Sequence, residues 1–110
     1  MELADEAKSA FDQALVDSTI AALDALGPTA KESIFLLLQR RNSITPDQIP
    51  KLVGEFVEAL QDVLGPTSRV VEKLIIAGLI ARRQVPANMA QGRNLLEVVG
   101  SIRLSQVSQS

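Results

Sequence analysis

The chain contains the same four-residue sequence twice, and each copy lies between apolar segments with helical spacing. The first copy is Leu26-Gly27-Pro28-Thr29, and the second, 38 positions later, is Leu64-Gly65-Pro66-Thr67. Glycine ends helices well because it adopts positive φ without the penalty of a Cβ atom. Proline begins a helix more readily than it continues one. The sequence therefore predicts two corners between consecutive helices, and with them an all-α fold.

Each corner also provides a threonine placed to cap the helix that follows. After the first corner, Thr29 and Glu32 have the spacing of a capping box, in which side chain and backbone satisfy each other's free N–H groups. After the second corner, Val70 occupies the position of the glutamate. We therefore expect a complete capping box at the first corner alone.

Apolar residues recur at three- and four-residue spacing in four long segments. These segments predict helices over residues 2–26, 29–41, 50–64 and 67–84, with a short turn at 45–49. The turn opens with Thr45-Pro46-Asp47-Gln48, which supplies an N-cap, a proline at the first helical position and a glutamine for a capping box. Residues 34–38 are all apolar, so we expect the second helix to be buried nearly all round and to lie at the centre of the fold.

The fourth predicted helix has a glycine, Gly78, near its middle. A glycine in a helix interior costs about 1 kcal/mol relative to alanine. One explanation is a neighbouring helix that approaches closely at this point, and a tolerated imperfection is the other.

The pattern changes after residue 84. We expect a linker at 85–94, a short amphipathic helix at 95–104 interrupted near Gly100, and a flexible polar tail at 105–110, all following a helical core domain at 1–84. The apolar positions of the short helix are Leu95, Val98, Val99 and Ile102. This helix either folds back on its own core or docks on another chain, and the sequence leaves both alternatives open.

Together these segments predict a compact bundle of four main helices plus a short C-terminal helix. At an offset of 38 residues, Ala21 aligns with Ala59, Asp24 with Asp62, and 36–38 with 74–76. The matches are consistent with an internal duplication that packs two helical hairpins about a pseudo-two-fold axis. They are also consistent with one favourable corner used twice, because two copies do not make a repeat protein.

The composition removes several classes of function. Hydrophobic residues make up 46% of the 110 positions, while aromatic residues make up 3%, all of them phenylalanine. The chain has no His and no Cys. It therefore lacks the side chain that most often acts as a general base, the commonest nitrogen and sulfur ligands for metals, and the thiol that serves as a low-pKa nucleophile. It also lacks Tyr and Trp, which stack on unpaired bases. We therefore expect a non-enzymatic protein with no catalytic, cofactor-binding or metal-binding residues, and no small-molecule substrate is evident.

The expected cellular compartment of the protein follows from similar observations on the sequence. No apolar run approaches the roughly 20 residues that span a bilayer. The first residues lack the basic start of a signal peptide, and the absence of cysteine fits a reducing compartment. We expect a cytoplasmic protein with no membrane partner.

The net charge of −2 conceals an asymmetry between the two parts of the chain. Residues 1–30 contain six acids and one base, for a charge of −5, and residues 31–110 contain seven acids and ten bases, for +3. Such a difference can steer self-association or the choice of a partner. A well-solvated outer face on the first helix is the simpler explanation.

Two arginine pairs are the candidate contact residues for an anion or a partner. Arg40 and Arg41 end one highly apolar helix, and Arg82 and Arg83 end the other. If the repeat is structural, the pairs can lie on one face and bind an anion or nucleic acid. The alternative is that they only complement the negative ends of the helix dipoles, at roughly 0.3–1 kcal/mol each.

A helix-turn-helix arrangement is conceivable for residues 29–64. The helix that would read DNA carries Glu55, Glu58 and Asp62, whose carboxylates would meet the phosphates. Nucleic acid is therefore possible but disfavoured as a partner. The same carboxylates, at neighbouring helical positions, are typical of a solvated face rather than of a hydrolase or metal site.

Several blocks of the sequence resemble the archaeal Nitrosopumilus output domain family. The blocks lie between residues 20 and 83 and include 33–38, 45–50, 55–60 and 70–76. The resemblance implies a small all-helical domain of the kind found as output modules of archaeal sensor or regulator proteins and as free-standing proteins. It brings no catalytic motif, and residues 85–110 fall outside it.

These observations lead to one functional expectation and one alternative. We expect a protein–protein interaction or signalling output module that associates with itself as a homodimer, because the second and fourth helices carry more apolar residues than a single face needs. The alternative is a small DNA-associated transcriptional regulator that uses the arginine-rich helix ends.

Overall fold

The computed structural model describes the backbone of residues 2–108 and the side chains of residues 10–104. The elements are α1 (Glu2–Asp24), α2 (Pro28–Asn42), the 3-10 turn η1 (Pro46–Gln48), α3 (Val53–Leu64), the 3-10 turn η2 (Gly65–Thr67), α4 (Ser68–Ala81), α5 (Ala87–Ala90) and α6 (Leu95–Ser108). Every regular element in this part of the chain is helical, which confirms the predicted all-α class.

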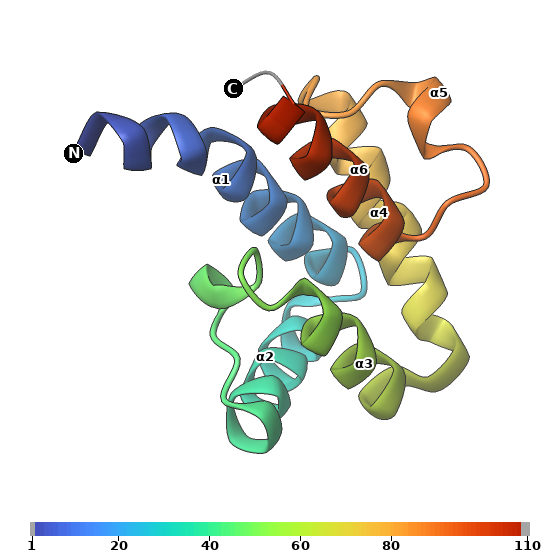
Figure 1. Cartoon of the computed structure of the whole chain (residues 1–110). Helices are drawn as coiled ribbons and strands as arrows, with labels where there is room; N and C mark the ends of the chain where they lie inside the picture. Colours follow the sequence, from blue (N-terminus) through green and yellow to red (C-terminus); the bar gives the residue numbers. More distant parts are fainter. Residues whose placement is uncertain (1, 109–110) are drawn as a thin grey trace.

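Helices α1 and α4 pack along each other, and the other helices are arranged around this pair (Figure 1). Helix α2 packs against α1 and α3, while α6 packs against α4 and α3. The principal extents are 39, 33 and 20 Å. Because a helix with its side chains is roughly 10–12 Å across, the smallest extent admits two layers of helices. Every helix therefore exposes one face.

Helices α1 and α4 approach each other closely at Gly78. A Cβ atom placed on this residue would lie 2.9 Å from the Cβ atom of Ser18, a separation that real Cβ contacts essentially never show. The guanidinium of Arg82, one turn further along α4, donates to Ser18 Oγ at 3.3 Å. The glycine in the middle of the fourth helix is therefore explained by close approach of a neighbouring helix.

Helix α6 belongs to the same core as the other helices. Leu95 and Val98 are fully buried, as are Phe56 of α3 and Leu79 of α4. At the other end of α6, the Arg103 guanidinium donates to the Pro50 carbonyl and lies 3.5 Å from the Asp12 carboxylate. The C-terminal helix thus folds back on its own chain, and residue 84 is not a boundary of the core.

Two further expectations for this region were wrong. Helix α6 is continuous through Gly100 and extends to Ser108, so that residues 105–108 are helical and only 109–110 of the predicted tail lie outside the described residues. The predicted linker at 85–94 contains α5 and the buried Val85. The polar C-terminal sequence continues the helix because the preceding turns are already anchored by buried apolar residues.

The predicted capping box at the first corner does not form. Gly27, with φ of 117°, is the N-cap of α2, and Pro28 takes the first helical position. Thr29 is therefore already inside the helix, and no side chain caps α2. At the turn before α3, by contrast, the box between Thr45 and Gln48 forms as predicted, with Thr45 N–H donating to Gln48 Oε1 at 3.2 Å.

The two identical corner sequences adopt different backbones. Gly27 has ψ of 145° and leads directly into α2, whereas Gly65 has φ of 59° and ψ of −135° and begins the turn η2. Both glycines have positive φ, as expected, but the second corner includes a 3-10 turn before α4 begins at Ser68. The corners themselves are therefore not related by an exact pseudo-two-fold symmetry.

Helix α2 is not the buried centre of the fold. Only Ile34 and Leu38 are buried along it, whereas Leu36 and Leu37 are 48% and 37% exposed. The run of five apolar residues covers most of the helix circumference, but α2 lies at the lower edge of the molecule in Figure 1 and packs mainly against α1 and α3. Helix α3 begins at Val53 rather than at residue 50, because Pro50 and Lys51 are still in the preceding turn.

None of the helices in the described residues combines the length and the apolar character needed to cross a lipid bilayer.

Candidate functional site

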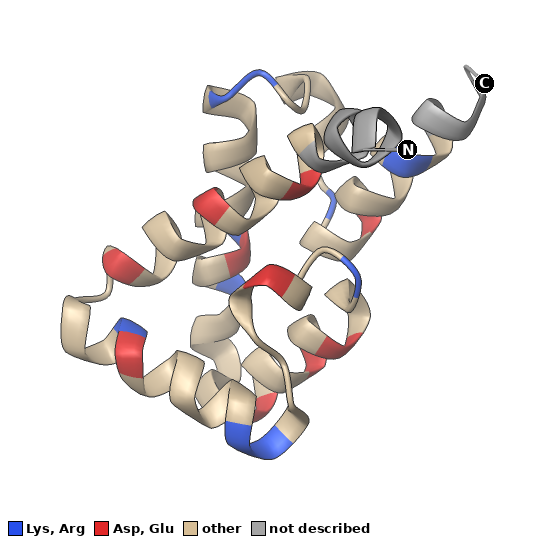
Figure 2. Ribbon diagram, turned by 90° about the vertical axis from the view of Figure 1, so that its left-hand side faces the viewer, with Lys and Arg blue, Asp and Glu red and all other residues tan. Residues whose placement is uncertain are grey.

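The two arginine pairs are far apart in the structure. In Figure 1 the C-terminal end of α2, which carries Arg40 and Arg41, lies at the bottom of the molecule, and the C-terminal end of α4 lies at the top. Figure 2 shows Lys and Arg spread over separate segments rather than gathered on one face. The structure therefore does not bring the two pairs together into a single contact site.

The second pair has local structural roles. Arg82 donates from Nη1 to the Gly78 carbonyl oxygen at 3.2 Å, as well as to Ser18, and so caps the end of α4. Arg83 has φ of 61°, and its backbone N–H donates to the Ile80 carbonyl at 2.9 Å. The side-chain contact of Arg82 matches the interpretation of this arginine as a cation at a helix C-terminus.

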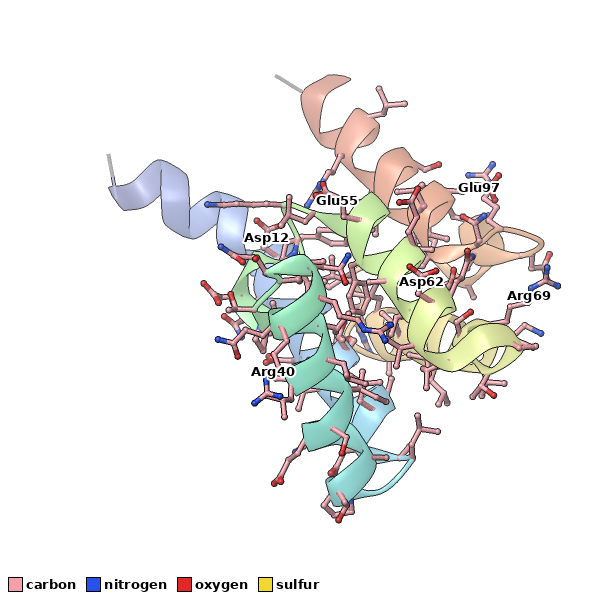
Figure 3. The ribbon with its side chains drawn as sticks, turned by 90° about the horizontal axis from the view of Figure 1, so that it is seen from below. Asp12, Arg40, Glu55, Asp62, Arg69 and Glu97 are labelled. Atoms are coloured by element: carbon pink, nitrogen blue, oxygen red, sulfur yellow. The ribbon has the colours of Figure 1, made fainter. Side chains whose placement is uncertain are left out.

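The acidic side chains of α3 all face solvent. Glu55, Glu58 and Asp62 are exposed, and Figure 3 labels Glu55 and Asp62 on this helix. Within the described residues, no group of three or more His, Cys, Asp or Glu side chains is placed to hold a metal ion. A helix with this charge would oppose DNA phosphates, and the carboxylates form the solvated face that their spacing indicates.

Helix α4 carries an exposed apolar stripe on its surface. The stripe consists of Val70, Leu74, Ala77 and Ala81, and we call these four residues the α4 stripe. Val70 is 50% exposed and Leu74 is 37% exposed. Because the four positions follow the spacing i, i+4, i+7 and i+11, they lie in one row along the helix. The apolar surplus of the fourth predicted helix indicates an exposed apolar face, but the sequence does not identify which residues form it.

An open groove of about 620 Å³ runs beside the stripe, between α3, α4 and the segment that joins α5 to α6. Its apolar wall is formed by Val57, Ile76 and Ile80, and Ala77 belongs to both the groove and the stripe. Three cationic side chains, Arg69, Lys73 and Arg93, also line this α4 groove. Their positive charge is partly balanced by one acid, Glu72.

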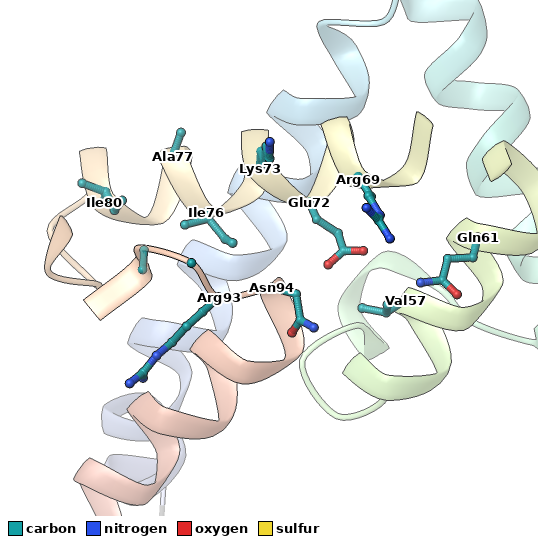
Figure 4. Close-up of a pocket in the computed structure, with 12 residues that line it drawn as sticks. Val57, Gln61, Arg69, Glu72, Lys73, Ile76, Ala77, Ile80, Arg93 and Asn94 are labelled. Carbon is teal, nitrogen blue, oxygen red and sulfur yellow. The ribbon is translucent and has the colours of Figure 1, made fainter. Parts of the chain in front are cut away.

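Glu72 is the unusual member of this set, since only 6% of the residue is exposed. Its Oε1 atom accepts a hydrogen bond from the backbone N–H of Leu95 at 3.2 Å, at the beginning of α6. In Figure 4 its carboxylate, the Arg69 guanidinium and the amides of Gln61 and Asn94 all lie at one end of the groove. This polar end forms only when α6 docks on α4, so local sequence patterns do not reveal it.

The start of α6 is fixed by a second set of hydrogen bonds. Asn94 Oδ1 accepts from the Glu97 N–H at 2.9 Å, and Glu97 Oε1 accepts from the Asn94 N–H at 3.0 Å. This reciprocal pair is a capping box, and Glu72 adds an acceptor from another helix at the positive end of the α6 dipole. The residues around the polar end of the groove are therefore held in place from two helices.

Comparison with known proteins supports the fold class. No family model and no curated protein matches the chain. The structure is similar to the crystal structure of PH0832 from Pyrococcus horikoshii OT3, with a TM-score of 0.72 and 22% sequence identity. The match covers 87% of this chain and 96% of that chain. At this identity the similarity concerns the fold alone.

Proposed function

We propose that the chain is a non-enzymatic protein–protein interaction or signalling output module of the cytoplasm, and that it binds a second copy of itself through α4. The observation that carries the proposal is the α4 stripe, in which Val70 and Leu74 remain 50% and 37% exposed on a helix whose opposite face is fully packed. The resemblance of residues 20–83 to output domains supports the signalling part of the proposal.

The order of large and small residues makes the stripe self-complementary. In an antiparallel pair of α4 helices with the two-fold axis between residues 75 and 76, Val70 lies opposite the partner's Ala81. Leu74 then lies opposite the partner's Ala77. Each large side chain faces a small one, which lets two helices interdigitate at the short end of the usual interaxial range of roughly 8–10 Å. An isologous contact of this kind closes as a dimer.

The size of the stripe sets the strength expected of the dimer. Burying a half-exposed Val or Leu side chain contributes about 1 kcal/mol, or about 4 kcal/mol for the four side chains of a dimer. Association costs roughly 4–15 kcal/mol in lost rigid-body freedom. The stripe alone therefore at most offsets this cost, so a dimer through α4 is expected to be weak, to need contributions from the other exposed side chains of the two helices, and to become populated only as the concentration rises.

Sedimentation equilibrium over a wide range of concentrations tests this proposal. The wild-type chain is expected to move from a species of 11.8 kDa towards a dimer as its concentration rises. Leu74→Glu is expected to remain monomeric, since it places a charge in the middle of the stripe. Leu96→Glu, on an exposed leucine of α6, is the matched control and should dimerise like the wild type.

Two results would contradict the proposal. A wild-type chain that stays monomeric at the highest attainable concentration excludes self-association. Dimerisation of Leu74→Glu at wild-type strength excludes α4 as the surface, and Leu36→Glu then tests the exposed pair on α2.

The weaker alternative is a DNA-associated regulator that uses the exposed Arg40 and Arg41 at the end of α2. The distance between the two arginine pairs and the acidic face of α3 both count against it. Duplex binding that falls with salt and is lost in the Arg40→Glu/Arg82→Glu double variant would favour this alternative. No binding at low salt would remove it.

A further inference from the structure

We propose that the α4 groove binds a small zwitterion of the α-amino acid class with an aliphatic side chain. In this site Glu72 accepts the ammonium group and Arg69 donates to the carboxylate. The proposal does not depend on self-association, because every residue that it uses comes from one copy of the chain.

The first argument is the carboxylate of Glu72. Burial of a charged group is costly unless the group is paired and hydrogen-bonded. Oε1 accepts from the Leu95 N–H, whereas none of the hydrogen bonds among the described residues reaches Oε2. In the same part of the chain, no side-chain oxygen is both fully buried and without a partner. Oε2 therefore opens into the groove, where a ligand cation can reach it.

The second argument is the position of Arg69. It lies three residues before Glu72 on the same helix, a spacing at which opposite charges commonly pair. Among the described residues these two make no ion pair, since the two ion pairs found there join Lys31 to Asp24 and Arg103 to Asp12. Both side chains nevertheless point to the same end of the groove (Figure 4). Two opposite charges that lie at one site without pairing match a ligand that carries both.

The third argument is the shape and polarity of the remaining wall. Val57, Ile76 and Ile80 offer an apolar surface next to the charged end, and Gln61 and Asn94 add amide groups beside it. The volume of about 620 Å³ lies within the usual range for sites that hold small molecules. An aliphatic side chain on the ligand would cover this surface while the two charged groups of the ligand reach Glu72 and Arg69.

The charged side chains around the groove also favour a zwitterion over a simple anion as the ligand. Arg93 donates from Nη1 to Ser101 Oγ at 2.9 Å and extends along α6, away from the polar end (Figure 4). A bare anion bound by Arg69 would lie beside the buried Glu72 carboxylate and be repelled by it. An ammonium group on the ligand replaces that repulsion with a charge-assisted hydrogen bond.

Titration of the full chain with L-leucine, followed by calorimetry and by amide chemical shifts, tests this inference. We expect saturable binding at one site, with shifts centred on the groove. N-acetyl-leucine lacks the ammonium group and leucinamide lacks the carboxylate, so each should bind at least about tenfold more weakly than leucine. Glycine, which lacks the aliphatic side chain, should also bind more weakly.

Two variants test the named residues. Arg69→Gln removes the guanidinium, and Glu72→Gln removes the charge but keeps an oxygen that accepts from the Leu95 N–H. Each should weaken leucine binding about tenfold or more. Arg41→Gln, on an exposed arginine at the far end of α2, is the matched control and should bind leucine like the wild type.

Absence of saturable leucine binding at millimolar concentration would overturn the inference. So would equal binding of leucine and N-acetyl-leucine, which would identify an anion groove instead. Because the comparison of ligands uses the wild-type chain, the inference is tested even if a variant at Glu72 fails to fold. Failure of dimerisation in the sedimentation experiment would leave these results unaffected.

Discussion

Ser18 of α1 lies so close to Gly78 of α4 that a Cβ atom on residue 78 would be 2.9 Å from both Cβ and Oγ of Ser18. The approach is between rigid parts of two helices, not between flexible ends of side chains. The packing of α1 on α4 therefore depends on the absence of a side chain at this one position.

The first prediction is that Gly78→Ala destabilises the protein. Alanine improves helix propensity by about 1 kcal/mol, but overpacking at a tight contact costs roughly 1–3 kcal/mol. We expect a net loss of about 1 kcal/mol in the free energy of unfolding, measured by urea titration. Gly100→Ala is the control, because open space surrounds that glycine within α6, and it should raise stability. Higher stability of Gly78→Ala would show that the two helices separate easily.

The second prediction concerns the helix caps. Thr29→Ala should change the free energy of unfolding by less than about 0.5 kcal/mol, because Thr29 lies inside α2 and caps nothing. Asn94→Ala should cost about 1 kcal/mol, because it removes the acceptor for the Glu97 N–H. Equal effects of the two substitutions in thermal or urea unfolding would contradict the assignment of the caps.

The third prediction tests the place of α6 in the core with two adjacent leucines. Leu95 is fully buried, so Leu95→Ala should cost about 2–5 kcal/mol. Leu96 is 48% exposed, and Leu96→Ala should stay within about 0.5 kcal/mol of the wild type. Urea unfolding followed by circular dichroism measures both. A small loss for Leu95→Ala would mean that α6 is dispensable for the core.

The fourth prediction concerns the backbone conformation of Arg83 in the second arginine pair. Arg83 has φ of 61°, a conformation that costs a non-glycine residue roughly 1–2 kcal/mol. Arg83→Gly is therefore expected to leave stability unchanged or to raise it by up to about 1 kcal/mol. The melting temperature measures this change. A marked fall in stability would show that the Arg83 side chain makes a contact that matters to the fold.

The helical class and the approximate element bounds could be predicted because they depend on local signals. Periodicity marks α1, α3 and α4, and the Thr45–Gln48 box marks the turn before α3. The burial of α2 could not be predicted in the same way. Its apolar run is compatible with burial all round, and only the flat arrangement of the helices decides that Leu36 and Leu37 stay exposed.

The candidate sites could be predicted from the sequence even less well than the burial of α2. The arginine pairs stood out in the sequence, but the path of the helices places them at opposite ends of the molecule. The polar end of the groove joins Glu72 to the Leu95 N–H across 23 positions, so it follows from the docking of α6 on α4 and not from a motif. The apolar surplus of α4 could be predicted, but only the packing of the opposite face into the core decides that Val70 and Leu74 are the residues left exposed.

The hydrogen bond between Glu72 and the start of α6 has a consequence for how the chain folds during synthesis. The ribosome synthesises α4 before α6, and until α6 has emerged, the part of α4 that it covers and the Glu72 carboxylate remain without it. Because α6 follows α4 along the chain, its docking is a later step of assembly, and it supplies Leu95 and Val98 to the core and a backbone donor to Glu72. A nascent chain stalled before this helix would present an open apolar cleft to chaperones and proteases.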